Sequence, residues 1–259
     1  MRDILNDKQK RRKRNVRKVT WPLLVPIVLV LFGFGVYKIW SNIYAKRCIS
    51  GIPEPTQTDI ESGEVGKEYD AKAINGRSYH IKMEYLARYD IKGLVVATYD
   101  YYDGKTTYDM AFPRDLSLSW GKMAELNNSI TYKHGNRKLS FQVSLGSQLS
   151  RNEMHQTSNN HLTTDNEEIL KKIRKVRNGD YIELKGYLVH ANVSSDAGSF
   201  ELTSSLTRLD HMDGAFDRTN TGCEVIYVEE IYWLNDDGSM SIPVLPSIIV
   251  SSLRTKGHK

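Results

Sequence analysis

The chain contains seven histidines, the side chains that most often bind transition metals in proteins. They are His80, His134, His155, His161, His190, His211 and His258. No HExxH pair occurs, and the six-residue separation of His155 and His161 does not place both on one face of a helix. The stretch "DHMDGAFD", residues 210–217, carries acids around a glycine but lacks the alternating oxygens and final glutamate of an EF-hand. We therefore predict no metal site and no cofactor.

Two cysteines, Cys48 and Cys223, could form a disulfide, remain separate thiols or supply a nucleophile. Both follow an apolar N-terminal segment that would place them outside the cytoplasm, where a cysteine pair is more often a disulfide than a catalytic set. Cys48 lies in a stretch of linker-like composition, so geometry does not force the two thiols together. The disulfide and the separate thiols both stay open, and a nucleophilic Cys223 assisted by His161 is a third alternative. A serine nucleophile lacks its usual G-x-S-x-G motif in this sequence.

Positive charge is concentrated at the start of the chain. Residues 1–20 carry nine Lys or Arg against Asp3 and Asp7, a net charge of +7, whereas the whole chain carries +5. Residues 21–259 therefore sum to −2. A nucleic-acid-binding domain needs basic side chains spread over a folded face to neutralise phosphates. The near-neutral body predicts no nucleic-acid partner.

The basic run precedes an apolar segment at residues 21–40, "WPLLVPIVLVLFGFGVYKIW". Twenty helical residues reach ~30 Å, the thickness of the hydrocarbon core of a bilayer. Trp21, Tyr37 and Trp40 stand where interfacial aromatic residues usually lie. A buried core helix is disfavoured by the flanking charge, and a cleaved signal peptide by the lack of an A-x-A site.

We therefore expect a single-pass signal anchor that contacts the lipid bilayer. Positive charge stays in the cytoplasm, so residues 1–20 are predicted to be a cytoplasmic tail. Everything after the anchor would lie outside the inner (cytoplasmic) membrane, in the periplasm or the extracellular space.

Three further regions follow the anchor. Residues 41–68 are rich in proline, glycine and acids, which is typical of a juxtamembrane linker. Residues 69–234 are predicted to form a β-rich domain, because β-branched and aromatic runs alternate with turn residues. Residues 235–259 are a C-terminal tail whose apolar piece, "IPVLPSIIV", is too short to span a bilayer. That piece would add an edge strand or touch the membrane or a partner.

Strand patterns dominate the predicted domain. The stretch 93–112 holds two β-rich runs around Asp103-Gly104, a dipeptide that type I′ hairpin turns favour. Residues 138–145 alternate apolar and polar side chains. Residues 180–191 alternate likewise and change phase at Gly186, as a bulge would produce. These patterns predict a hairpin and two further strands.

One helix is well marked, at residues 165–176. It would begin with Thr164 or Asp165 as its N-cap and end before Asn178-Gly179. It leads straight into a strand, and this order resembles an OB-type small barrel. We expect a mainly β fold with one or two helices: an N-terminal transmembrane helix followed by an extracytoplasmic β-rich, OB-like barrel domain.

Several motifs follow one another in an order that resembles a family of uncharacterised bacterial exported or single-pass membrane-anchored proteins. They are "FPRDLSLSWGKM" (112–123), "GNR" (135–137), "SNNHL" (158–162), "GDYIELKGYLV" (179–189), "SSLTRLD" (204–210) and "GCEVIYVE" (222–229). The resemblance implies a compartment outside the cytoplasm and no particular activity. The connection "HMDGAFDRTNT" between the last two motifs is longer than the resemblance leads us to expect.

The resemblance also implies a set of polar residues that could share one site. They are Arg114, Asp115, Trp120, Asn136, Arg137, Asn160, His161, Ser205, Arg208 and Glu224. Their convergence in one cleft would make a ligand-binding groove. The alternative is structural: an Arg-Asp pair beside Pro113 would pin a turn, and His161 would make a local hydrogen bond ahead of the helix.

An anchor and a β-rich body without a catalytic motif favour a membrane-anchored, extracytoplasmic binding or assembly module. Its partner would be another envelope protein or a second copy of the chain. The alternative is an extracytoplasmic hydrolase that uses Asp115, His161 and Glu224 as acid and base groups. A hydrolase needs two carboxylates, or a carboxylate and a histidine, within one water of each other.

Overall fold

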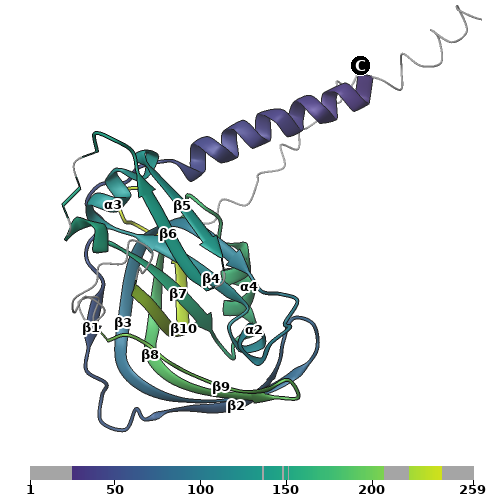
Figure 1. Cartoon of the computed structure of the whole chain (residues 1–259), viewed down its shortest axis with the longest axis vertical. Helices are drawn as coiled ribbons and strands as arrows, with labels where there is room; N and C mark the ends of the chain where they lie inside the picture. The colour runs from purple at the N-terminus through teal and green to yellow at the C-terminus, as the bar shows by residue number, and fades with distance from the viewer. Residues whose placement is uncertain (1–24, 136, 148, 151, 207–221, 241–259) are drawn as a thin grey trace, which may run out of the picture.

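The computed structural model describes residues 25–135, 137–147, 149–150, 152–206 and 222–240. An apolar N-terminal helix, Val25–Ala45, projects from a β-rich domain (Figure 1). The helix is long and apolar enough to cross a membrane, and its apolar part is not buried against the domain. It matches the predicted span over its described part and continues five residues past Trp40.

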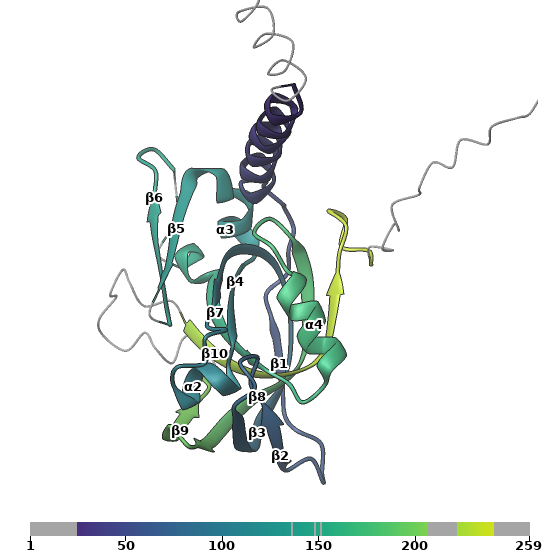
Figure 2. The same cartoon turned by 90° about the vertical axis from the view of Figure 1, so that its right-hand side faces the viewer.

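In the described part of the chain, five strands close into a barrel (Figures 1 and 2). In order around the barrel they are β3 (Ser78–Asp100), β4 (Arg114–Ser119), β7 (Thr157–Thr163), β10 (Gly222–Trp233) and β8 (Tyr181–Ser195). The β8–β3 pairing closes the circle, and the β7–β10 pair is parallel while the other pairs are antiparallel. Helix α4 (Glu167–Lys175) connects β7 to β8. This order is the topology of an OB barrel, which confirms the predicted fold class.

Both β3 and β8 are longer than the barrel, and their outer halves form a second, curved sheet. Strand β2 (Gly66–Lys72) pairs with the first half of β3, and β9 (Gly198–Thr203) pairs with the second half of β8. A register shift between Tyr85 and Ala87 marks where β3 passes from this sheet into the barrel. We call β2, β9 and the outer halves of β3 and β8 the extension sheet (Figure 1).

Two apolar clusters stabilise these two parts. The barrel interior contains Ile91 and Leu184, both without exposed surface. The second cluster lies between the extension sheet and α2 (Thr107–Ala111) and includes Ile81 and Val189. Burying each such side chain contributes about 1.5–3 kcal/mol relative to leaving it exposed.

A hairpin lies across the outside of the barrel. Between β4 and β7 the chain forms α3 (Gly121–Glu125), η1 (Asn127–Ser129), β5 (Ile130–Gly135), β6 (Lys138–Val143) and η2 (Glu153–His155). Strands β5 and β6 form a separate two-stranded sheet. Side chains of this β5–β6 hairpin contact the outer face of β4 and β7, so the hairpin covers that face.

The prediction of a β-hairpin within residues 93–112 is wrong for the segment after the turn. Asp103-Gly104 does lie in a turn, but α2 follows it in place of a strand. Thr106 and Asp109 form a capping box, in which each side chain accepts a hydrogen bond from the backbone N–H of the other. This helix-start signal outweighs the β preference of the neighbouring tyrosines.

The structure also corrects the linker predicted at residues 41–68. The N-terminal helix continues to Ala45, and strand β1 (Thr56–Thr58) pairs with β3. Ile49 and Ile52 are 3% and 4% exposed and belong to the barrel core. Ile49 and Ile52 are single apolar residues among prolines and acids. The composition of this segment is therefore polar overall and gave no sign of the two core residues.

The predicted helix is present as α4, with a different N-cap. The cap is Asn166 instead of Thr164 or Asp165, and its side chain accepts from the N–H groups of Glu168 and Ile169. The helix ends at Lys175, so its boundaries shift by one or two residues from the prediction.

The strand predicted over residues 180–191 is part of β8, and the irregularity at Gly186 belongs to its partner strand. Gly186 lies opposite the register shift between Val228 and Glu230 of β10. A Cβ atom at Gly186 would stand 1.9 Å from the backbone oxygen of Tyr227, so this close approach requires glycine.

Candidate functional site

Alternate residues of β4, β7 and β10 form a polar face that is nevertheless buried. Asp115 lies opposite His161, and Ser117 lies opposite Asn159, which in turn lies opposite Cys223. The residues between them belong to the barrel core: Leu116, Leu118, Leu162 and Ile226. Side chains alternate along a strand, so these five polar residues point outward from the barrel, beneath the β5–β6 hairpin. We call them the polar face.

Asp115 is the centre of this face and has no exposed surface. Its Oδ1 lies 2.9 Å from His161 Nδ1 and accepts from Arg137 Nη1 at 2.9 Å. Its Oδ2 lies 3.4 Å from Nε2 of His134. Burial alone would raise the pKa of Asp115, but the charge of His161 and the hydrogen bond from His134 outweigh it and hold that pKa below its usual range. Asp115 is therefore ionised.

Arg137 connects the hairpin to Asp115 and to α2. It sits in the tight β5–β6 turn with a positive φ of 61°. Its guanidinium donates to Asp115 at 2.9 Å and to Asp109 at 2.6 Å. The same group lies 3.3 Å from the ring centroid of Tyr101 and 4.0 Å from that of Tyr108. One side chain thus holds the hairpin turn against two other segments through charge and aromatic contact.

His134 brings a second hairpin residue to the polar face. Its Nε2 lies 2.8 Å from Asn159 Oδ1 and faces Asp115 as well, so two acceptors surround this nitrogen. Its Nδ1 is buried and has no hydrogen-bond partner among the described residues. This arrangement fits an imidazole that carries its proton on Nε2.

The cluster resembles a catalytic dyad in geometry, but its surroundings fit a structural role better. The side chains of Asp115 and His161 are 0% and 3% exposed. The thiol on the same face, Cys223, has its pKa raised to about 12, by burial first and then by the negative charges of Glu224 and Asp115. That thiol is protonated at neutral pH and is a poor nucleophile. The network can hold the β5–β6 hairpin on the barrel.

Arg114 does not contact the polar face and instead binds the end of helix α4. It is 6% exposed, and its guanidinium donates to the carbonyls of Ile173 at 3.0 Å and Val176 at 2.7 Å. Its Nε lies 3.0 Å from a carboxylate oxygen of Asp100. Arg114 therefore satisfies the last carbonyls of α4, and the expected Arg114–Asp115 pair is replaced by two separate pairs.

Three other predicted site residues lie away from the polar face. Trp120 has no exposed surface, packs in the barrel core and donates its indole N–H to Glu54. Asn160 points to the barrel interior and donates to a β4 carbonyl at 2.9 Å. Glu224 is 2% exposed and lies opposite Asn160, so alternation places it on the other side of the sheet from Asp115.

Some predicted residues fall outside the described part of the chain. These are Asn136, Arg208, the acidic stretch at 210–217 and the apolar piece of the C-terminal tail. Ser205 is described and donates to the backbone oxygen of Cys223 at 3.3 Å.

Cys48 and Cys223 are both described and are not joined by a disulfide. Cys48 is exposed just beyond the N-terminal helix. Cys223 is largely enclosed and has a hydrogen bond with the Asn159 side chain. Of the alternatives left open by the sequence, the structure therefore has the two separate thiols.

Residues missed from the sequence complete the cluster, above all His134 and Asn159. A usable signal was present in the strands, where Asp115, Ser117 and Ser119 alternate with leucines in an otherwise apolar region. Such alternation of small polar residues with core residues indicates a covered polar face. Nothing local identified the β5–β6 hairpin as its cover.

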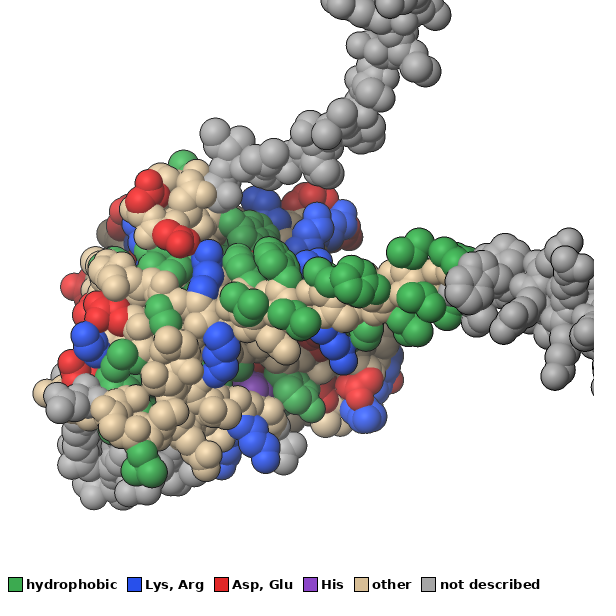
Figure 3. Space-filling view, turned by 90° about the horizontal axis from the view of Figure 1, so that it is seen from above, with side chains coloured by type: hydrophobic (Ala, Val, Ile, Leu, Met, Phe, Trp, Pro, Cys, Tyr) green, Lys and Arg blue, Asp and Glu red, His purple; other side chains and the backbone are tan. Residues whose placement is uncertain are grey.

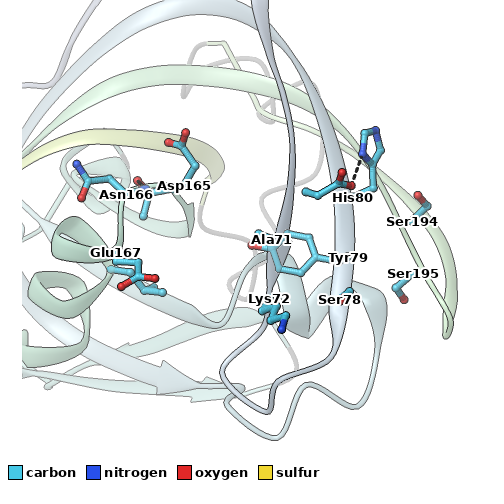
Figure 4. A pocket seen from close by; sticks show the side chains of 13 residues that line it. Ala71, Lys72, Ser78, Tyr79, His80, Asp165, Asn166, Glu167, Ser194 and Ser195 are labelled. Carbon is cyan, nitrogen blue, oxygen red and sulfur yellow. Dashed lines mark hydrogen bonds and ion pairs between the residues drawn. The ribbon is translucent and has the colours of Figure 1, made fainter.

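An open groove lies at the other end of α4, beside the extension sheet (Figure 4). Its volume is about 820 Å³. Its polar lining comes from β2, β3, the end of β8 and the start of α4: Asp70, Lys72, Ser78, His80, Asp165, Asn166, Glu167, Ser194 and Ser195. His80 Nδ1 lies 2.9 Å from Asp70 Oδ1. The groove offers hydrogen-bonding groups of both charges on an accessible surface.

No group of three or more His, Cys, Asp or Glu side chains among the described residues could hold a metal ion. No protein-family model, no curated protein and no solved structure matches this chain.

Proposed function

We propose that this chain is a single-pass membrane protein that presents its OB-type barrel outside the cytoplasmic membrane as a binding or assembly module. The apolar helix and the basic residues that precede it support the anchor and its orientation. The partner is another envelope protein or a second copy of the chain.

The observation that carries this proposal is the contrast between a covered face and an open groove. OB barrels bind oligonucleotides and oligosaccharides on the face of their second and third strands, which are β4 and β7 here. The β5–β6 hairpin occupies that face, and its His134 faces Asp115, which is buried beneath it. The groove beside α4 is instead accessible and polar. Its lining suits a peptide or protein surface better than a phosphate backbone, since Asp70 and Glu167 are acidic.

Site-specific photocrosslinking tests this proposal. A photoreactive residue at Ser194 in the groove is expected to give a discrete adduct in cells, whereas one at exposed Gln142 on the hairpin is not. An adduct of twice the chain mass identifies a second copy, and another mass identifies an envelope protein. Glu167→Lys should abolish the adduct, whereas Glu168→Lys, a change at the next residue of α4, should not. Absence of an adduct at Ser194 would contradict the proposal.

A hydrolase is the second candidate, and one observation favours it: the 2.9 Å contact between Asp115 and His161. The third proposed group, Glu224, lies on the opposite side of the sheet. If the hydrolase interpretation holds, His161→Gln removes hydrolysis of the substrate while leaving the photocrosslink at Ser194 unchanged.

A further inference from the structure

The end of the N-terminal helix is bonded to three separate parts of the domain. The Tyr44 hydroxyl donates to Asp180 Oδ1 at 3.1 Å, in the turn between α4 and β8. Asn127 Nδ2, from η1, donates to the backbone oxygen of Arg47 at 2.9 Å. The Arg47 side chain pairs with Asp236 at 3.0 Å, in the turn after β10.

These contacts fix the direction of the helix relative to the barrel. Asn127 is 1% exposed and supplies a donor to carbonyls that a helix end leaves unsatisfied. The backbone of Gly179 lies directly against Tyr44, because a Cβ atom at Gly179 would stand 2.4 Å from the Tyr44 oxygen. Ile49 and Ile52 then enter the barrel core. The helix therefore continues into the domain without a flexible tether.

Tyr44 also lies close to the predicted boundary of the membrane. The rings of Trp40 and Tyr44 stack with centroids 5.3 Å apart, and such aromatic residues prefer the membrane–water interface. Four helical residues rise ~6 Å. The polar layer of one leaflet is roughly 5–8 Å thick. With Trp40 at the hydrocarbon boundary, the domain residues that bond Tyr44 reach the outer edge of the headgroups.

We propose that the edge of the domain around this junction rests on the phospholipid headgroups in a fixed orientation. The edge comprises the turn at 177–180, η1 and the turn at 235–238. The exposed Arg177 of this edge contacts lipid phosphates. Figure 3 shows the apolar side chains of the helix exposed, with Lys, Arg, Asp and Glu side chains around its base.

This orientation determines where the groove opens. Helix α4 ends next to the 177–180 turn, and its first residues line the groove at its other end. The groove is therefore held away from the lipid and toward partners. The inference rests on the proposed function, since it requires that Val25–Ala45 spans the membrane.

The test uses the full chain in phospholipid nanodiscs that contain lipids with a spin label on the headgroup. One fluorescent noncanonical residue is introduced at Asn42, Arg177 or Asn192, all exposed, on the helix, the proposed contact edge and the extension sheet respectively. We expect strong quenching at Asn42 and Arg177 and none at Asn192.

The three positions separate the possible failures. If quenching is strong at Asn42 but the same at Arg177 as at Asn192, the domain has no fixed orientation on the membrane. The anchor is then still supported by the quenching at Asn42. Loss of quenching at Asn42 would overturn the anchor itself. Asn127→Ala is expected to reduce quenching at Arg177 without changing Asn42, whereas Asn128→Ala, the exposed neighbouring residue, should change neither.

Discussion

At the scale of single residues, the polar face depends on one buried carboxylate. Asp115 compensates the guanidinium of Arg137 and contacts two imidazoles, so removing its charge leaves buried donors without an acceptor. We predict that Asp115→Asn lowers the free energy of unfolding of the full chain by about 3–5 kcal/mol. Chemical denaturation in detergent, followed by tryptophan fluorescence, measures this change.

The matched control is Asp196→Asn, which removes a carboxylate that pairs with Arg77 at the surface. The Asp196 side chain is 70% exposed, so its loss should change the unfolding free energy by less than about 1 kcal/mol. If the two substitutions lowered the unfolding free energy equally, Asp115 would contribute no more to stability than a surface ion pair does.

The same carboxylate predicts how stability depends on pH. The pKa of Asp115 is lowered in the folded chain, because the charge of His161 and the hydrogen bond from His134 outweigh burial. The unfolded chain therefore binds this proton more readily, at the ordinary pKa of about 3.9. Stability is fully present above that value and is lost as pH falls below it.

Acid titration of the unfolding free energy measures this loss. We expect a steep decrease below pH ~4 in the unaltered chain and a shallower one in Asp115→Asn. If the unfolding free energy fell equally steeply with pH in both chains, the lowered pKa of Asp115 in the folded chain would be contradicted.

The motif resemblance predicted part of the cluster formed by the polar face and the hairpin residues that contact it. Asp115, Arg137 and His161 were identified, and the structure places them in one cluster. His134 and Asn159 were not, because their contact depends on the β5–β6 hairpin folding back over β7. Glu224 was grouped with them, although strand alternation and the parallel β7–β10 register put it on the other side of the sheet.

At the scale of elements, the segment after the apolar N-terminal helix belongs to the domain. Ile49 and Ile52 are core residues, and β1 pairs with β3. A shortened chain that begins at Gly66 should be less stable than one that begins at Cys48. Two buried isoleucines predict a loss of about 3–6 kcal/mol. Urea denaturation of the two shortened chains measures the difference, and equal midpoints would contradict this assignment.

Long periodic elements could be predicted from sequence, and elements set by distant contacts could not. The α4 helix and the β8 strand carry clear caps and alternation, and both are present. Helix α2 was mistaken for a strand because tyrosine-rich runs favour strands, although its capping box was visible at Thr106. Strand β1 has three exposed residues and is defined by its pairing with β3, which no local pattern reveals.

At the scale of the whole molecule, we propose that the apolar N-terminal helix spans the membrane and holds the OB-type barrel outside the cytoplasm. The barrel follows from strand order and pairing, and the helix from its length and apolar surface. Hydrogen bonds of Tyr44 and Asn127 join these two parts at the end of the helix. Neither the junction nor the hairpin that covers the OB face could be predicted from sequence, since both depend on contacts between residues far apart in the chain.

The most direct test is the topology of the full chain. Two reporters are fused in turn to its C-terminus: alkaline phosphatase, which is active only outside the cytoplasm, and a fluorescent protein that fluoresces only inside. The basic residues 1–20 should stay in the cytoplasm, so we predict active phosphatase and no fluorescence at the C-terminus, with the opposite result for fusions after Val19. A fluorescent C-terminal fusion with inactive phosphatase would contradict the account.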